Sequence, residues 1–266
     1  KFVYLERNIQ SDKISSLQTK QIQGLNISRK YRRYYPHNEI AAQILGYTNL
    51  DDDGISGIEK DFNNYLKGQS GWIYKTKGWS GKVQHKNGMP FKRPINGSNI
   101  QLTIDLEYQS ILEQELLKRQ IKTEAISATG IIMDPETGEV LAMASTPGFN
   151  NNKFSSSNPE YHRIKSITDQ FEPGSTYKIV SAVSGLNNDI ITLENEFNCE
   201  NGTYQYYTVE IKDHGSDKGY GMLTLPQIMQ HSSNIGIIKM IEIVGPKTLY
   251  TTSRDFGFGS RTGISL

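Results

Sequence analysis

A proline and a glycine ahead of a short apolar run constrain the fold of this chain more than any other feature. Pro173 and Gly174 interrupt any preceding regular structure, and residues 179–186 are apolar enough to form a buried helix. We therefore predict a helix start near Ser175, whose hydroxyl suits the free amide groups at a helix N-terminus. Lys178 follows about one helical turn later, so both side chains are predicted to lie on one face.

A serine and a lysine on one helix face can carry out covalent chemistry if their surroundings change them. Free serine is a weak nucleophile, and free lysine is protonated at neutral pH. Burial disfavours the ammonium form and the positive end of the helix dipole acts in the same direction, so we expect Lys178 to take the Ser175 proton. A chain of this length contains about one S-x-x-K by chance, so the spacing alone also fits a non-catalytic helix start.

A second polar motif, Ser232-Ser233-Asn234, interrupts the apolar run over residues 223–244. The pattern predicts two helical stretches around a short polar corner, which could aim the Ser232 hydroxyl and the Asn234 amide at one site. Another S-x-N stands at residues 156–158, inside a run of Asn and Ser that ends in Pro159. That run is typical of an exposed loop, so we predict no catalytic role for it.

The order S-x-x-K and then S-x-N resembles the first two motifs of the penicillin-recognising serine acyltransferases, whose third motif is K-[ST]-G on a strand. Other segments are similar to the class B penicillin-binding proteins, in the same order along the chain: Tyr34-Tyr35-Pro36 and residues 41–47, 53–59, 66–68, 102–109, 133–145 and 168–175. The resemblance covers about residues 31 to 266. The short spacing between residues 46–47 and 53–59 is more similar to the cell-division branch than to the cell-elongation branch.

This resemblance implies a peptidoglycan D,D-transpeptidase that cross-links stem peptides ending in D-Ala-D-Ala during septal wall synthesis and is inhibited by β-lactams. It implies that Ser175 is the acylated nucleophile, Lys178 its base, and Ser232 and Asn234 the proton relay and substrate-positioning pair. The backbone N–H of Ser175 would be one oxyanion donor. The implied place is the periplasmic face of the inner membrane, and the implied partners are a membrane glycosyltransferase and other division proteins.

The third motif, K-[ST]-G, is absent from the 266 residues. Lys247-Thr248-Leu249 and Arg261-Thr262-Gly263 come close, but the second follows Ser232 too soon and resembles a loop ahead of the motif. The chain also begins without an initiator methionine, a signal core or a membrane-spanning run. We therefore expect a chain truncated at both ends, with a membrane anchor upstream and the third motif downstream.

The predicted organisation is α+β, with a boundary in the Pro- and Gly-containing stretch 92–99. Residues 1–97 are expected to form a non-catalytic accessory domain of the pedestal or dimerisation type, and residues 98–266 the N-terminal part of the penicillin-binding transpeptidase fold. Apolar spacing predicts a helix from residue 105 to about 122. Residues 129–133 and 139–144 flank a turn and predict a β-hairpin. The resulting fold is an antiparallel sheet with a helical lobe that carries Ser175 and Ser232, incomplete at the C-terminus.

Composition limits the other function classes. The net charge of +1, from 29 basic and 28 acidic residues, argues against a nucleic-acid partner, and the basic and aromatic segment 29–35 is interpreted as a pedestal strand. The 5 histidines include no i, i+4 pair, so neither a metal nor a cofactor is predicted. The single cysteine, Cys199, excludes an intrachain disulfide and is interpreted as a partly buried loop residue.

Four alternative functions would use parts of the same sequence. A Ser-His-Asp hydrolase would use His231, but no G-x-S-x-G occurs, and His231 is interpreted as a surface or helix-capping residue. A β-lactam sensor domain or a serine β-lactamase would share the acylation chemistry, and the pedestal-like residues 31–68 argue against both. A non-catalytic cell-wall assembly protein would fit the absent third motif.

Overall fold

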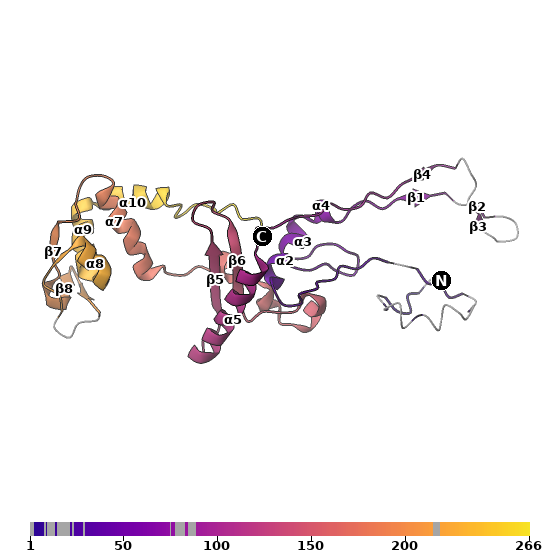
Figure 1. Cartoon of the computed structure of the whole chain (residues 1–266), viewed down its shortest axis with the longest axis horizontal. Helices are drawn as coiled ribbons and strands as arrows, with labels where there is room; N and C mark the ends of the chain where they lie inside the picture. The colour runs from indigo at the N-terminus through magenta and orange to yellow at the C-terminus, as the bar shows by residue number, and fades with distance from the viewer. Residues whose placement is uncertain are drawn as a thin grey trace. The chain divides into compact units, whose positions relative to one another are not determined.

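The computed structural model describes residues 3–7, 9, 14, 22, 24–28, 30–74, 76–77, 83–84, 89–214 and 219–266. The chain divides into two compact units, which we call unit 1 (Lys1–Asp169 with Ser265–Leu266) and unit 2 (Gln170–Ile264), both traced in Figure 1. Each unit contains helices and antiparallel strand pairs, so the predicted α+β class is confirmed. None of the helices in the described part of the chain is long and apolar enough to cross a membrane.

The first part of unit 1 alternates short helices with glycine turns. Its elements are α2 (Ala42–Leu45), α3 (Gly57–Asp61), α4 (Asn63–Leu66) and the antiparallel pairs β1 (Trp72–Ile73) with β4 (Phe91–Lys92) and β2 (Thr76–Lys77) with β3 (Val83–Gln84). Gly46 follows α2 at φ +71°, and a Cβ there would lie 1.8 Å from the backbone oxygen of Ser56. A larger residue at position 46 would therefore separate α2 from the turn before α3.

The basic and aromatic segment begins with Arg29, which lies outside the described residues. Residues 30–35 belong to no strand in the described structure, so the predicted pedestal strand is not found there. Arg33 pairs with the buried α3 carboxylate of Glu59 at 2.7 Å, and the buried Tyr35 donates its hydroxyl to the same group at 3.3 Å. These contacts give the cation and one aromatic ring of the segment a structural role.

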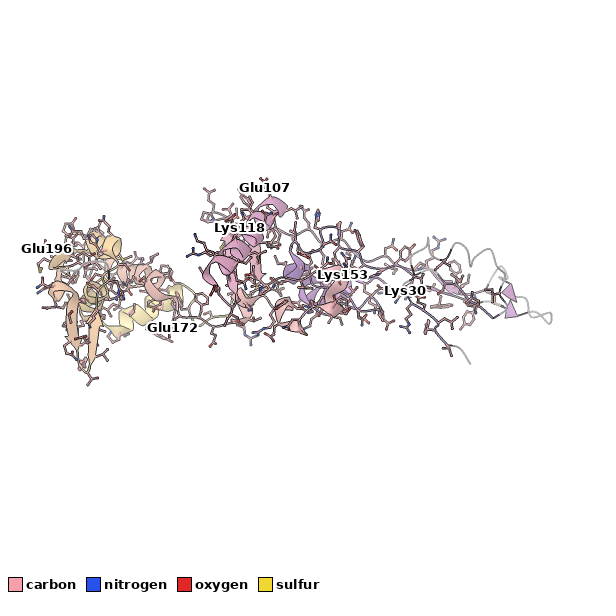
Figure 2. All side chains as sticks on the ribbon, turned by 90° about the horizontal axis from the view of Figure 1, so that it is seen from below. Lys30, Glu107, Lys118, Lys153, Glu172 and Glu196 are labelled. Carbon is pink, nitrogen blue, oxygen red and sulfur yellow. The ribbon has the colours of Figure 1, made fainter. Side chains whose placement is uncertain are left out.

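The second part of unit 1 contains the predicted helix and hairpin. Helix α5 (Leu106–Thr123) begins at Asp105, whose carboxylate accepts from the backbone N–H groups of Glu107 and Tyr108 at 2.8 and 3.1 Å. Strands β5 (Ala128–Met133) and β6 (Val140–Thr146) pair antiparallel. Glu107 and Lys118 lie on the exposed side of α5 (Figure 2). The most buried residue of the helix is Gln109 rather than one of its leucines.

Glutamine side chains cover the edge of β6 that does not pair with β5. Gln109 donates to the Met143 carbonyl at 2.9 Å and accepts from the Met143 N–H at 2.8 Å. Gln43 of α2 accepts from the Ser145 N–H at 2.9 Å. These amides satisfy backbone groups that a further strand would otherwise pair, and they join α2 and α5 to the sheet.

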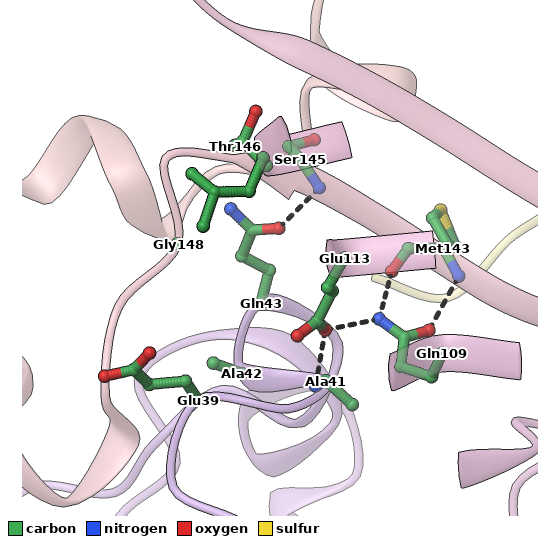
Figure 3. Close-up of a pocket in the computed structure, with 11 residues that line it drawn as sticks. Glu39, Ala41, Ala42, Gln43, Gln109, Glu113, Met143, Ser145, Thr146 and Gly148 are labelled. Atoms are coloured by element: carbon green, nitrogen blue, oxygen red, sulfur yellow. Dashed lines mark hydrogen bonds between the residues drawn. The ribbon is translucent and has the colours of Figure 1, made fainter. Parts of the chain in front are cut away.

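A small cavity of about 90 Å³ lies among α2, α5 and β6 (Figure 3). One oxygen of the Glu113 carboxylate, which lines it, accepts from the Ala41 N–H at 2.8 Å and from Gln109 at 2.7 Å. Burial raises the pKa of Glu113 despite these two hydrogen bonds. Residues Ala41, Ile44, Met143 and Ile164 form the apolar core next to this network.

We expect Gln109→Ala to lower the free energy of unfolding by about 2–4 kcal/mol, because both buried backbone groups of Met143 lose their partner. Gln114→Ala, on the exposed side of the same helix, serves as the matched control and should stay within about 0.5 kcal/mol of the wild type. Urea denaturation monitored by circular dichroism measures both. Equal midpoints for the two variants would show that water replaces the Gln109 amide without loss.

The rest of unit 1 connects the hairpin to the end of the unit through η1 (Asn151–Ser156), η2 (Pro159–His162) and α6 (Lys165–Thr168). Asn151 donates its amide to the carbonyls of Ala42 and Gly46, so this segment packs on α2. The second S-x-N, residues 156–158, lies here, and Ser157 contacts the His162 ring at 2.7 Å. The predicted loop character of residues 156–158 is confirmed in the form of 3₁₀ turns and their ends.

Unit 2 packs helices against short strands around one apolar core. In chain order its elements are η3 (Gly174–Tyr177), α7 (Lys178–Leu186), β7 (Glu196–Asn198), η4 (Glu200–Gly202), β8 (Thr203–Tyr206), β9 (Val209–Lys212), β10 (Met222–Thr224), α8 (Leu225–His231), α9 (Asn234–Val244) and α10 (Pro246–Asp255). Strands β7 and β10 pair antiparallel, as do β8 and β9. Ile228, Ile235 and Met240 are fully buried at its centre, which fixes α8 and α9 against each other.

Candidate active site

Ser175 lies in the 3₁₀ turn η3, and Lys178 is the first residue of α7, so the predicted helix start is confirmed. Gly174 takes the left-handed conformation, with φ +59°, directly before the serine. The predicted capping role of Ser175 is wrong, because no side chain caps the described first turn of η3 or of α7. Since Ser175 already lies inside the helical backbone, its hydroxyl points to other partners instead of the free amide groups.

The second motif forms the predicted polar corner between two helices. Ser232 ends α8 in the left-handed conformation at φ 55°, and Ser233 caps α9 by accepting from the Gly236 N–H at 2.9 Å. A Cβ at Gly236 would lie 2.6 Å from the Ile228 side chain, so the two helices are in close contact behind the corner. The corner therefore rests on the buried core of unit 2.

The four predicted site residues form one hydrogen-bonded network within unit 2. The Ser232 Oγ lies 3.0 Å from the Ser175 Oγ and 3.0 Å from the Lys178 Nζ. Lys178 also donates to the Asn234 Oδ1 at 2.7 Å and to the Ser232 carbonyl. The predicted direct contact between Ser175 and Lys178 is replaced by a chain through Ser232, because none of the hydrogen bonds among the described residues joins the two directly.

The surroundings of the network favour proton transfer to the lysine. Burial lowers the pKa of Lys178, and the negative charge of Asp213 opposes part of that effect. Ser175 is exposed and Lys178 half-buried, so a substrate can reach the hydroxyl while the amine stays partly desolvated. A hydroxyl both donates and accepts, so Ser232 can pass a proton from Ser175 to a neutral Lys178.

Asp213, at the end of β9, is part of this site and was not predicted. Its carboxylate contacts Ser233 and the first backbone amides of α9, and the neighbouring Lys212 carbonyl accepts from the Asn234 Nδ2 at 2.9 Å. The local sequence around Asp213 carries no signal for such a role. The sequence signal for it is Ser233, a small polar residue inside an apolar run, because such a side chain needs a hydrogen-bond partner when it is buried.

The two near-matches to the third motif, His231 and Cys199 were given no catalytic role by the sequence, and they lie outside the hydrogen-bonded network of the four site residues. Lys247-Thr248-Leu249 belongs to α10, and the described residues 256–264 contain no strand, so neither near-match forms a third-motif strand. His231 is exposed and stacks on Tyr220, as a surface residue. Cys199 is fully buried, not partly buried as predicted, and its Sγ lies 3.4 Å from the Ser233 Oγ. Within the described ranges, no group of His, Cys, Asp or Glu could hold a metal ion.

Comparison with known proteins identifies the family of both parts of the chain. Residues 128–266 match the penicillin binding protein transpeptidase domain, and residues 1–102 match the penicillin-binding protein dimerisation domain. The peptidoglycan D,D-transpeptidase FtsI of Escherichia coli (strain K12) is 33% identical over 266 residues, which are 100% of this chain and 44% of FtsI. The stage V sporulation protein D of Bacillus subtilis (strain 168) is 28% identical over 98% of this chain and 40% of its own length. The chain thus spans less than half the length of these relatives.

Solved structures agree with this assignment. A peptidoglycan synthetase from Bifidobacterium adolescentis ATCC 15703 matches with a TM-score of 0.74 and 25% identity, over 88% of this chain and 42% of that one. Penicillin binding protein 3 from Mycobacterium tuberculosis, complexed with aztreonam, matches with a TM-score of 0.71 and 25% identity, over 87% of this chain and 48% of that one. Sequence, fold and motif order agree over both domains, and the chain therefore belongs to the class B penicillin-binding proteins.

Proposed function

We propose that this protein is a peptidoglycan D,D-transpeptidase, which joins stem peptides ending in D-Ala-D-Ala through an acyl-enzyme on Ser175. The observation that carries the proposal is the hydrogen-bonded chain from the Ser175 Oγ through the Ser232 Oγ to the Lys178 Nζ, with both distances at 3.0 Å. This chain connects an exposed hydroxyl with an amine whose pKa burial lowers. The 33% identity to the D,D-transpeptidase FtsI supports the same activity.

In the proposed acylation, the Ser175 Oγ attacks the carbonyl carbon of the penultimate D-Ala while its proton passes through Ser232 to neutral Lys178. The carbon–nitrogen bond to the last D-Ala then breaks, and Lys178 returns the proton to the leaving amine. An acceptor amine of a second stem peptide then attacks the acyl carbon and forms the cross-linking amide while the ester bond to the Ser175 Oγ breaks. The proton of the amine passes to Lys178 and through Ser232 back to the Ser175 oxygen. The backbone N–H of Ser175 would be one donor to the developing oxyanion.

Asn234 is proposed to orient the base and to contact the substrate. Its Oδ1 accepts from the Lys178 Nζ at 2.7 Å, and its Nδ2 donates to the Lys212 carbonyl at 2.9 Å. Both ends of the amide are therefore held, which restricts the rotation of the side chain and keeps the lysine amine beside Ser232. A stem peptide that displaced the Lys212 contact would gain the Nδ2 donor for itself.

β-Lactams are proposed inhibitors, because their strained amide would acylate Ser175 in place of the D-Ala-D-Ala donor. Related structures of Mycobacterium tuberculosis penicillin binding protein 3 are complexed with aztreonam and with ampicillin, at 25% and 26% identity to this chain. These relatives support a β-lactam ligand for this protein. No cofactor or metal enters the proposed reaction.

The cellular role and the domain limits are also proposals. The resemblance to the cell-division branch supports a role in septal wall synthesis, and the similarity to the peptidoglycan D,D-transpeptidase FtsI supports a place in the cell envelope. The proposed place is the periplasmic face of the inner membrane, with anchoring by an upstream transmembrane helix. Residues 1–97 are proposed to form the pedestal that contacts a membrane glycosyltransferase and other division proteins, and residues 98–266 to belong to the transpeptidase domain. No nucleic-acid partner is proposed, in keeping with the net charge of +1.

The test is intact-protein mass spectrometry after incubation with a penicillin, on the full-length gene product and on residues 1–266 alone. We expect a stable penicilloyl adduct on the full-length protein and peptide mapping to locate it at Ser175. Residues 1–266 hold no K-[ST]-G motif, and loss of one oxyanion donor should slow their reaction by about 100- to 1000-fold. A folded full-length protein without any adduct would contradict the proposed activity and favour the non-catalytic assembly role.

A further inference from the structure

Asp213 connects the end of strand β9 to the start of helix α9 through three hydrogen bonds. Its Oδ2 accepts from the Ser233 Oγ at 2.7 Å, and its Oδ1 accepts from the backbone N–H groups of Asn234 and Ile235 at 2.6 and 3.1 Å. These two amides belong to the free donors at a helix N-terminus, where a carboxylate is also favoured by the helix dipole. Asp213 therefore caps α9 from a different part of the chain.

The residue that Asp213 holds lies between the two residues of the second motif. Ser233 is fully buried and cannot reach water, so its hydroxyl depends on partners inside unit 2. Its neighbours Ser232 and Asn234 carry the two side chains that contact Lys178. A shift of Ser233 would move both contacts at once, because all three residues form one tight corner between α8 and α9.

We propose that Asp213 is a positioning residue of the acylation reaction, which acts by fixing the Ser232–Asn234 corner and by placing a negative charge near Lys178. The proposal rests on the proposed transpeptidase function, because acylation of Ser175 is the reaction whose rate it sets. Asp213 does not touch the reacting atoms. It acts through Ser233 on the serine that relays the proton and on the asparagine that holds the base.

The charge of Asp213 has an effect that can be separated from the cap. Burial lowers the pKa of Lys178, and Asp213 works against that change. Without the charge, Lys178 would lose its proton more readily, and acylation would begin at lower pH. Among the described residues, the other titratable groups around the corner are Cys199 beside Ser233, Lys212 of β9, His214 next in the chain, and Lys239 of α9.

Two of these neighbours already form ion pairs with other residues. Lys212 pairs with Glu210 at 2.7 Å, and Lys239 pairs with Glu200. Burial raises the pKa of Cys199, so its thiol stays neutral through the physiological range. Of the described charged groups, Asp213 is thus the one that both contacts the corner and acts on Lys178.

The test compares Asp213→Ala and Asp213→Asn in the full-length protein, by the second-order rate of acylation with a fluorescent penicillin from acid to alkaline pH. Asp213→Ala removes both the cap of α9 and the negative charge. Because the Ser232–Asn234 corner should then shift, we expect the acylation rate to fall by about 10- to 100-fold. The amide of Asp213→Asn can still accept from the two α9 amides and donate to Ser233. We expect this variant to lose less than about tenfold at its best pH and to shift its rate profile towards lower pH.

Glu210→Ala is the matched control, since it removes a carboxylate from the same hairpin that pairs only with the exposed Lys212 among the described contacts. Its rate and pH profile should equal those of the wild type. If Asp213→Ala fails to fold in a thermal melt, the profile of Asp213→Asn decides. An unmoved profile for Asp213→Asn, or a wild-type rate for folded Asp213→Ala, overturns the positioning role. A wild-type protein that is not acylated at all overturns the proposed function instead.

Discussion

Ser175→Ala is expected to abolish the covalent adduct with a penicillin and to leave the fold unchanged. The Ser175 Oγ is the exposed end of the hydrogen-bonded chain to Lys178, and alanine removes the only atom that could form the ester. Loss of the nucleophile in a serine enzyme lowers the rate by on the order of a million-fold, so no acylation should be detectable. Fluorescent-penicillin labelling after denaturing electrophoresis measures the loss directly.

The structure also predicts that this variant keeps its stability. A serine that caps a helix contributes about 0.5–2 kcal/mol, which alanine would remove. Ser175 caps neither described helix start, so the melting temperature of Ser175→Ala should match that of the wild type. Ser156→Ala, in the second S-x-N of the sequence, is the control, because its hydroxyl contacts only the Lys153 carbonyl among the described groups. Labelled Ser175→Ala, or unlabelled Ser156→Ala, would contradict the assignment of the nucleophile.

Elements that depend on neighbouring residues could be predicted from the sequence. The break at Pro173 and Gly174 indicated the helix start near Ser175, and the turn at residues 134–138 indicated the β5–β6 hairpin. In that turn the Asp134 carboxylate accepts from the Glu136 N–H at 2.7 Å, a contact within three residues. Such signals are local, because backbone dihedrals and side-chain-to-backbone hydrogen bonds over a few residues decide the outcome.

Features that depend on distant residues could not be predicted in the same way. Helical spacing placed Ser175 and Lys178 on one face, but the position of the lysine amine is set by Ser232 and Asn234, more than fifty residues away. The burial of Gln109 against Met143 likewise violates the apolar pattern of α5, since an edge strand needed hydrogen-bond partners. The role of Asp213 could not be predicted for the same reason. Its partners become neighbours only after β9 and α9 have packed together.

Lys178→Arg is expected to lower the acylation rate by about 100- to 10000-fold, the usual contribution of a positioned general base. Arginine keeps a positive charge and donors for Ser232 and Asn234, but it stays protonated at every accessible pH and cannot accept the Ser175 proton. The wild-type rate should rise with pH until Lys178 is neutral, and this rise should come below the ordinary range of lysine because burial lowers the Lys178 pKa. The arginine variant should lose that rise.

Lys239→Arg provides the matched control for this result. Lys239 is also a partly buried lysine of unit 2, with 19% of its side chain exposed, but it pairs with Glu200 and stacks over Tyr204 rather than meeting Ser232. Its arginine variant should keep the wild-type rate and pH profile in stopped-flow measurements with a fluorescent penicillin. A Lys178→Arg protein that acylates as fast as the wild type would show that Ser175 loses its proton to another group. A wild-type rate that does not change with pH would exclude a lysine base.

Because Ser232 contacts both Ser175 and Lys178, the two side chains are expected to belong to one proton path. The double variant of Lys178→Arg with Ser232→Ala should then acylate no more slowly than the slower of the two single variants.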